Sequence, residues 1–403
     1  MNRIFTVPCA LVIVLIIIPC IHTAASTAAD RNPVVTGNSE FAVDIYSKLK
    51  ATEGNLFFSP YSISTALAMT YAGARGNTAK EMADVLYFSL EQEKLHHAFA
   101  DLESDLNAIT GQGHIQLLIA NSLWPQRDYP FREEFLSLVE KHYGTPITPV
   151  DFAGATEEAR RIINGWVEKK TIKKIKDLIR ERDLTSATVL ALVNAIYFKG
   201  DWASKFDPEQ TRLSDFTTAE GGTIRVPMMH QRRKFGYRKL EDVQVLELPY
   251  VGGQLSMLIV LPTEPLGLTE LESKLSTELL EIWISALPME AVDVYLPRFT
   301  ITWGTFDLVE PMQELGMKDA FLSGRADFSG MDGTRSLVID RILHKAFIEV
   351  NEKGTEAAAA TAVIMLKGPR PHRFCADHPF LFLIRENSTG SILFLGRVVD
   401  PGA

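Results

Sequence analysis

In the first third of the chain, hydrophobic positions recur at helical spacing. Phe41, Ile45 and Leu49 share one helical face, and a second face is formed by Leu95, Phe99, Leu102 and Leu106. Both patterns predict amphipathic helices that bury one side. Residues 78–81 read Thr-Ala-Lys-Glu, which is typical of a capping box, in which the Thr and Glu side chains bond to the first backbone amides of a helix. We therefore expect a third helix to begin there.

From the middle of the chain onward, the pattern predicts strands. Residues 189–198 are apolar except for Asn194, as expected for a strand covered on both faces, and the buried amide must find partners. Alternating or β-branched stretches recur at 243–250, 254–262, 291–299 and 390–399, mixed irregularly with helical stretches such as 311–317. This order indicates the α+β class. No linker or repeat interrupts the chain after Asn38, so we expect a single domain.

The N-terminus has the pattern of a secretory signal peptide. Arg3 precedes an apolar run at 9–21, and small residues follow it. The run is shorter than the about 20 apolar residues that a membrane-spanning helix needs, and no later stretch is long enough. We therefore expect a signal peptide over 1–24, with cleavage between 24 and 29, a secreted chain without a membrane anchor, and a folded domain over 30–403.

Composition narrows the classes of partner. The 403 residues are 46% hydrophobic and carry a net charge of −9, which suits a large core and disfavours nucleic-acid binding. Cys9 and Cys20 would leave with the signal peptide, so Cys375 remains as a free thiol. We interpret it as a small apolar strand residue, with a mixed disulfide or dimer as the alternative; otherwise we expect a monomer. Asn387-Ser388-Thr389 is a candidate N-glycosylation site.

Signatures of catalysis are absent from the sequence: it contains no G-x-S-x-G, H-E-x-x-H, Walker or G-x-G-x-x-G motif. The adjacent pair His96 and His97 would diverge on a helix, so we interpret it as part of a solvated face rather than a metal site. We expect a protein that is not an enzyme and needs no metal or cofactor.

Two basic segments are candidate glycosaminoglycan sites, although such runs are more often solvated faces and the first is interleaved with acidic residues. The first contains Lys169, Lys170, Lys173, Lys174, Lys176, Arg180 and Arg182, and the second contains Arg232, Arg233, Lys234, Arg238 and Lys239.

The stretch 350–379 is the most informative part of the sequence. It begins as a strand, passes Gly354, continues through small residues to Val363, and ends rich in Pro and Arg. A helix is the first interpretation of its alanines. As an extended strand, alternate residues from Thr355 to Met365 would form one small or apolar face, with Glu356 opposite. Such a strand would enter a sheet without burying a charge.

Residues 352–361 resemble the hinge of the reactive-centre loop of the serpins, and residues 374–384 resemble the C-terminal signature of that family. Further serpin-like blocks follow in family order at 55–69, 163–171, 192–202, 296–299, 315–321 and 326–330. The chain is thus identified as a serpin, with a looser similarity to secreted arthropod members.

The resemblance implies one α+β domain of three β-sheets and about nine helices, with an exposed loop over 352–378. It also implies inhibition as a suicide substrate, in which a serine protease cleaves the loop and is held as a covalent acyl-enzyme. The hinge then inserts as a new central strand, a known case of stored strain released by strand addition.

The same resemblance assigns roles to individual residues. The hinge comprises Glu352, Gly354, Thr355, Glu356, Ala357, Ala358, Ala359, Ala360 and Thr361. The polar cluster that the family calls the shutter is matched by Ser59, Ser62, Asn194 and His344. The tryptophan of the breach above it is matched by Trp202. All five residues would also suit a purely structural role as buried polar groups with satisfied hydrogen bonds. Non-inhibitory serpins typically carry bulky, charged or Pro residues in the hinge. This hinge has none, which favours inhibition over a secreted binding or carrier function.

The residue before the cleaved bond, P1, has four candidates. The family register, counted from Gly354, points to Gly368. However, Pro369 follows Gly368 and Pro371 follows Arg370, and proline after the cut removes an amide hydrogen and fixes φ. We therefore favour Lys367, which suits a trypsin-like protease with an acidic pocket, followed by Gly368, Arg370 and Leu366.

The other candidates imply other targets. Cleavage after Gly368 would indicate an elastase-like protease, and cleavage after Leu366 a chymotrypsin-like one. A loop that resists cleavage would indicate a secreted binding protein. The stretch 95–106 resembles the heparin-binding helix of the family, but it carries Asp101, Glu103 and Asp105, which argues against activation by heparin.

Overall fold

The computed structural model describes residues 32–110, 113–145, 147–285, 287–354 and 370–403. Several predicted features lie outside these described residues. They are the signal peptide at 1–24, the hinge residues Thr355, Glu356, Ala357, Ala358, Ala359, Ala360 and Thr361, and the P1 candidates Leu366, Lys367 and Gly368.

Ten α-helices lie within the described ranges, where about nine helices were expected. They are α1 (Pro33–Leu49), α2 (Pro60–Tyr71), α3 (Gly76–Leu86), α4 (Gln92–Thr110), α5 (Glu133–Tyr143), α6 (Phe152–Lys170), α7 (Leu268–Lys274), α8 (Thr277–Ile284), α9 (Val309–Leu315) and α10 (Ser329–Asp332). The apolar faces predicted for α1 and α4 are buried as expected. Within the described ranges, no helix is both long and apolar enough to cross a bilayer.

The capping box predicted at Thr78 is wrong. Helix α3 begins two residues earlier, at Gly76. The Thr78 hydroxyl accepts a hydrogen bond from the backbone N–H of Asp327 (2.9 Å), and the Glu81 carboxylate accepts from the backbone N–H groups of Lys318 and Asp319 (2.7 Å each). Both side chains thus bind a segment distant in sequence, where they satisfy backbone donors that lack other partners.

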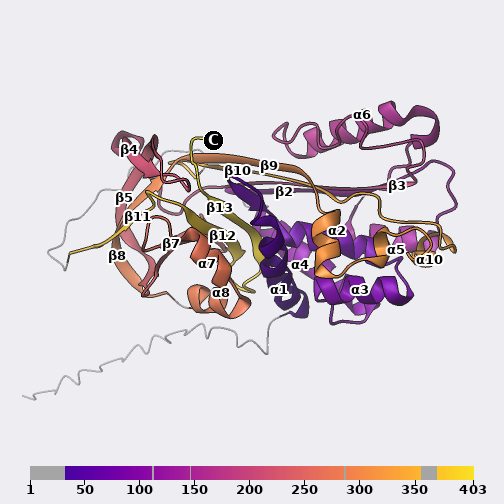
Figure 1. Cartoon of the computed structure of the whole chain (residues 1–403), viewed down its shortest axis with the longest axis horizontal. Coiled ribbons are helices and arrows are strands. Elements are labelled where there is room, and N and C mark those ends of the chain that lie inside the picture. Colours follow the sequence, from indigo (N-terminus) through magenta and orange to yellow (C-terminus); the bar gives the residue numbers. More distant parts are fainter. Residues whose placement is uncertain (1–31, 111–112, 146, 286, 355–369) are drawn as a thin grey trace, which may run out of the picture.

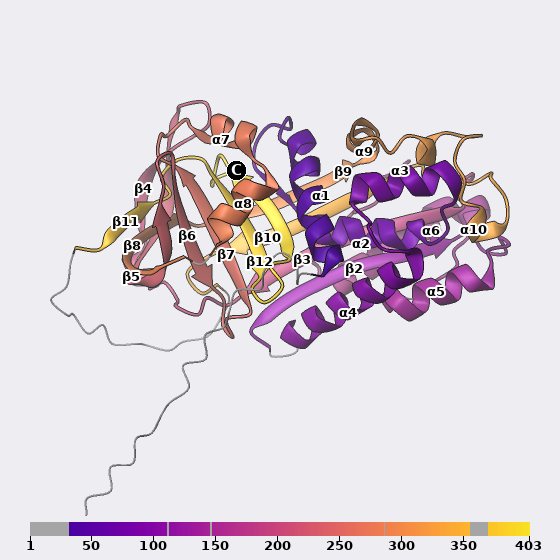
Figure 2. The same ribbon diagram turned by 90° about the horizontal axis from the view of Figure 1, so that it is seen from below.

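A four-stranded sheet runs along the molecule (Figure 1). Its order is β2 (Ile115–Pro125), β3 (Leu190–Gly200), β10 (Leu343–Val350) and β9 (Phe299–Asp307). The central pair β3 and β10 is parallel, with His344 opposite Asn194, whereas β2 and β9 pair antiparallel with their neighbours. Helix α6 lies on one face of this sheet, and α2, α4 and α5 lie on the other (Figures 1 and 2).

Strand β3 is covered on both faces, as its sequence predicted. Val193, Ala195 and Tyr197 pack into a small core beneath α6 and the segment after it. The alternate residues Ile196 and Phe198 belong to the main core, which α1 and α2 share. The central sheet is therefore sandwiched between two separate apolar layers.

A nine-stranded sheet forms the other end of the molecule (Figure 2). Its path is β1 (Leu56–Phe58), β13 (Ile392–Val398), β12 (Phe380–Glu386), β7 (Leu255–Pro262), β6 (Val243–Pro249), β5 (Thr223–Lys239), β8 (Met289–Pro297) and β11 (His372–Cys375), with β4 (Arg212–Thr217) paired to β5.

The α+β class is confirmed, but the three sheets expected are joined into two in the described part of the chain. Strand β5 is 17 residues long. It pairs with β4 and β8 along its first part and with β6 only from Gly236 to Lys239. One continuous strand thus connects by hydrogen bonds what would otherwise be two sheets.

Candidate functional site at the opening of the central sheet

Ser59 lies where β1 ends and α2 begins. Its hydroxyl accepts a hydrogen bond from the N–H of Ser62 (3.0 Å) and donates one to the carbonyl of Leu393 (2.6 Å). Serine in the N-cap position followed by Pro60 at the first helical position is a strong start signal, because Pro has no amide hydrogen to leave unpaired. The cap therefore fixes the end of α2 beneath the central sheet.

The amide of Asn194 connects β3 to that helix end. Its Nδ2 lies 2.7 Å from the Ser62 carbonyl oxygen, 2.8 Å from Ser62 Oγ and 2.7 Å from Asn121 Oδ1. Asn121 stands directly opposite Asn194 on β2 and also accepts from Ser62 Oγ at 3.1 Å. Sequence reasoning missed Asn121, although a polar residue within the apolar strand at 115–125 is a signal of the same kind as Asn194.

His344 closes the cluster from β10. Its Nε2 accepts a hydrogen bond from the Ser59 backbone N–H at 3.2 Å, so the other ring nitrogen, Nδ1, carries the proton and donates it to Asn194 Oδ1. Complete burial lowers the pKa of His344 to about 3. The ring is therefore neutral at physiological pH, and it ties β10 to both β3 and α2.

The structure brings the four predicted shutter residues together with Asn121 under β3 and β10, which pair in parallel within the four-stranded sheet. Apart from the N-cap bond between Ser59 and Ser62 within α2, each bond described above joins groups from different elements. Separating β3 from β10 would break the bond between His344 and Asn194 and leave two buried polar groups unpaired unless a new strand replaced it.

Trp202 lies at the far end of the same strand pair. The ring is buried and stacks on Tyr250, with centroids 4.6 Å apart and planes at 10°. Its Nε1 donates to the carbonyl of Asn351 (2.9 Å), which follows directly after β10. Trp202 thus fixes the point where the chain leaves the sheet toward the predicted loop.

Gly354 is required by both conformation and space. Its φ is +69°, a value that side-chain-bearing residues rarely adopt, and a Cβ at this position would lie 2.1 Å from the backbone nitrogen of Trp202. No other residue fits without moving the start of the hinge.

Glu352, the other described hinge residue, has a buried side chain. It accepts hydrogen bonds from Arg298 Nε (2.6 Å) and from the hydroxyl of Thr211. Burial opposes ionisation, but these bonds outweigh it and hold the pKa of Glu352 below its usual range. An ionised carboxylate therefore fastens the base of the hinge to the start of β9 and to β4.

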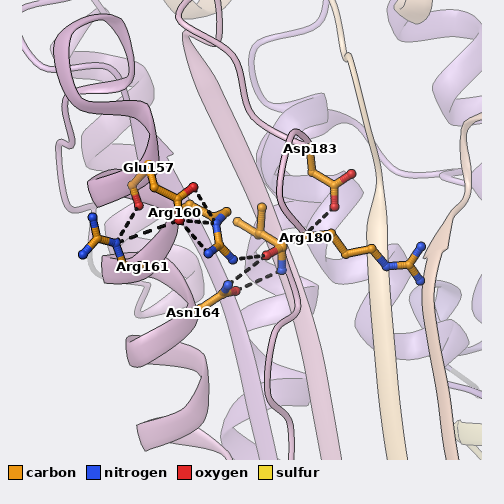
Figure 3. Close-up of polar contacts among 7 residues, drawn as sticks. Glu157, Arg160, Arg161, Asn164, Arg180 and Asp183 are labelled. Atoms are coloured by element: carbon orange, nitrogen blue, oxygen red, sulfur yellow. Dashed lines mark hydrogen bonds and ion pairs between the residues drawn. The ribbon is translucent and has the colours of Figure 1, made fainter.

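Helix α6 and the segment 171–189 form a cover over β2 and β3. Figure 3 shows how their polar groups meet. Asn164 holds the backbone of Ile179 from both sides, donating to its carbonyl (2.8 Å) and accepting from its N–H (2.9 Å). Arg160 reaches the same carbonyl at 3.0 Å while forming a two-pronged pair with Glu157. Four residues of this segment, Ile172, Lys173, Asp177 and Arg182, have positive φ, so the tether holds a strained backbone.

Both basic segments are partly neutralised. In the first, Lys174 lies 3.6 Å from Glu349. The Lys170 ammonium lies over the Trp166 ring, which holds its position without neutralising its charge. In the second, Arg232 makes a bidentate pair with Asp293, at 2.6 and 2.7 Å.

Arg370 is exposed and lies two residues before the start of β11 at His372. Cys375 at the end of β11 is a half-buried free thiol. Burial, and then the nearby Asp377, raise its pKa to about 11. Because the reactive thiolate is suppressed, the interpretation as a small strand residue fits better than a mixed disulfide.

Asn387 follows β12, and its side chain is engaged. Its Nδ2 donates to the carbonyl of Gly253 (2.9 Å), and its Oδ1 accepts from Ser256 Oγ (2.7 Å). A glycan on Nδ2 would have to displace the first of these bonds, and glycosylation stays a prediction.

The interpretation of His96 as solvated is wrong. His96 is fully buried and its Nδ1 lies 2.6 Å from the hydroxyl of Tyr143 on α5, because α4 packs this face against α5. His97, one residue on, is exposed and contacts the ring of His142. Among the residues that the structure describes, no three His, Cys, Asp or Glu side chains are grouped so as to hold a metal ion.

Comparison with known proteins gives consistent matches. A family model described as Serpin (serine protease inhibitor) matches residues 36–401. The chain is 44% identical over 378 residues to the leukocyte elastase inhibitor of Equus caballus, covering 91% of this chain and 99% of that protein. It is 43% identical over 394 residues to Serpin B3 of Homo sapiens, covering 92% and 100%. The solved structure of uncleaved ovalbumin superimposes with a TM-score of 0.82 at 32% identity, covering 91% of this chain and 100% of that one.

Proposed function

Because the chain belongs to the serpin family, whose members are named as protease inhibitors rather than enzymes, we propose that it inhibits a serine protease as a suicide substrate. The protease serine attacks the P1 carbonyl carbon, an ester forms as the amide bond breaks, and the new amine stays on the C-terminal piece. That piece contains β11, β12 and β13, which remain hydrogen-bonded in the nine-stranded sheet.

The parallel pair β3 and β10 is the observation that carries this proposal. Six residue pairs, from Leu343–Val193 to Ile348–Phe198, join the two strands. The hinge follows directly after β10, so a strand that folds back from it would run antiparallel to both neighbours. Insertion would replace one parallel ladder by two antiparallel ones, which are more stable per residue and offer new partners to the shutter groups.

We propose a trypsin-like target with Lys367 as P1. The support is chemical: Lys367 is a basic residue whose following bond does not involve proline. An elastase-like target with Gly368 as P1 is the second candidate, because a relative at 44% identity is named leukocyte elastase inhibitor.

One experiment distinguishes the two targets. The protein is incubated with trypsin, elastase and chymotrypsin, complexes that survive SDS are recorded, and the C-terminal fragment is weighed by mass spectrometry. With Lys367 as P1, that fragment begins at Gly368, and Lys367→Ala abolishes the trypsin complex whereas the matched control Arg370→Ala keeps it. A fragment that begins at Pro369 supports Gly368. Clean cleavage without any complex would overturn the inhibitory proposal.

We also propose that the protein is secreted as a monomer. The pattern of residues 1–24 supports secretion, and the N-terminal sequence of protein recovered from the medium of expressing cells should begin between residues 25 and 30. The elution volume in size-exclusion chromatography tests the monomer. Retention of the uncleaved N-terminus inside the cells would refute secretion. We also propose that the two basic segments bind glycosaminoglycans weakly. Because their charge is partly neutralised, the protein should elute from a heparin column at low salt.

A further inference from the structure

A polar cavity of about 210 Å³ lies at the β2 edge of the four-stranded sheet, between α2, α4, β2, the end of α5 and α6. Hydroxyl, amide and charged groups line much of its wall. The lining includes Thr65, Glu103, Asn121, Tyr143, Trp166 and Lys170. The residues that line the cavity include neither Trp202 nor the described hinge residues Glu352 and Gly354.

Glu103 on α4 contributes an acidic side chain to the lining of this cavity. The side chain is half-buried, and within the described part of the chain it has no hydrogen-bond or ion-pair partner. Burial raises the pKa of Glu103 to about 7. The titratable and charged neighbours that face it are the buried phenols of Tyr61 on α2 and Tyr143 on α5, and Lys170 on α6. A half-buried carboxylate without a partner loses part of its hydration, and a bound positive charge would recover part of that free energy.

Lys170 does not supply that charge. Its side chain is exposed and its ammonium lies 5.8 Å from the centroid of the Trp166 ring. Solvent screens an exposed charge of this kind. The contact also indicates that the Trp166 ring, which lines the same cavity, can stack against a cation.

We propose that this cavity binds a small organic cation, a primary ammonium or guanidinium compound, with Glu103 as its counter-ion. An anion is disfavoured because it would face the Glu103 carboxylate. The Thr65 hydroxyl donates to the Tyr61 carbonyl, so its oxygen can still accept a hydrogen bond from an N–H group of the ligand.

Occupancy of the cavity would act on the shutter. Asn121 lines the cavity and also accepts hydrogen bonds from Ser62 and Asn194. A ligand packed against Asn121 therefore stabilises the closed sheet and slows loop insertion, a consequence that rests on the proposed inhibitory function. Binding of the cation does not depend on protease inhibition, so an experiment can refute either proposal without refuting the other.

Calorimetric titration of the whole protein tests the site. The probes are n-butylamine and methylguanidine, with n-butanol as the uncharged control and butyrate as the anionic one. Only the ionised carboxylate pairs with the cation, so affinity should rise about tenfold from pH 6 to pH 8, with release of about half a proton per ligand at pH 7.

The variant Glu103→Gln keeps the shape of the side chain and removes its charge, and it should weaken cation binding at least about tenfold at pH 8. The matched control Asp105→Asn, an exposed residue of the same helix, should bind as the wild type does. Circular dichroism checks that both variants are folded. No binding of either cation at about 10 mM, equal binding of n-butanol, a preference for butyrate, or unchanged affinity in Glu103→Gln would each overturn the proposal.

Discussion

His344 should make the stability of the native fold depend on pH in a defined way. In the folded protein its pKa is lowered to about 3 by burial, whereas in the unfolded chain the ring titrates near its usual 6.5. Below pH 6.5 the unfolded chain therefore binds a proton that the folded protein does not. The stabilisation is fully present above pH 6.5 and is lost progressively as pH falls toward 3.

The size of the effect follows from those two values. At pH 5 the unfolded state gains about 2 kcal/mol from protonation of this ring, while the folded state gains almost nothing. Buried His96, whose pKa is lowered to about 4 by burial and by its histidine neighbours, acts in the same direction. The contribution of His344 must therefore be isolated by substitution.

The assay compares urea unfolding of the wild type and His344→Gln at pH 8 and pH 5. The variant is less stable at both values, because it loses the bonds to Ser59 and Asn194. The decisive quantity is the change with pH, which should be about 2 kcal/mol smaller in the variant than in the wild type. His97→Gln, at an exposed position on α4, should keep the wild-type pH dependence. An identical pH dependence in the wild type and His344→Gln would refute the reasoning.

Three further substitutions test other parts of the account. Thr355→Arg would place a charge on the inserting face and convert the inhibitor to a substrate, so the covalent complex with the protease should be lost. The control Glu356→Arg, on the opposite face, should keep the complex. An undiminished yield of covalent complex with Thr355→Arg would contradict this prediction. Gly354→Ala should lower the free energy of unfolding by more than about 2 kcal/mol, because it adds a clash with Trp202 to the strain of positive φ. The control Gly253→Ala, at a φ of +68° with nothing within 4 Å of the added Cβ, should lower it by about 1 kcal/mol. Equal urea midpoints for the two variants would refute the steric argument. Asn164→Ala should cost about 2 kcal/mol and speed hydrogen exchange of the Ile179 amide, and unchanged exchange would show that the tether does not hold the segment.

The sequence predicted those elements whose pattern reflects burial alone. Phe41, Ile45 and Leu49 are buried on α1, and residues 189–198 form a strand covered on both sides. The capping box at Thr78 failed because its side chains bind Asp327 and Lys318, which lie far away in sequence. The interpretation of His96 as part of a solvated face failed for a related reason, since its burial depends on how α4 packs against α5.

The residues of the site were likewise only partly predictable from the sequence. The apolar strand pattern predicts that Asn194 is a buried polar residue, but only the family resemblance links it to His344. Asn121, which stands opposite Asn194, required the register of β2 and β3. The tether from Asn164 to Ile179 spans 15 residues and joins a side chain to the backbone, so no residue pattern announces it.

The proposed mechanism requires the cleaved hinge to enter the sheet between β3 and β10. The most direct test is thermal unfolding of the protein before and after a single cut in the loop. Two new antiparallel ladders should raise the unfolding temperature by more than about 10 °C. An unchanged or lowered unfolding temperature after cleavage would contradict insertion of the hinge between β3 and β10.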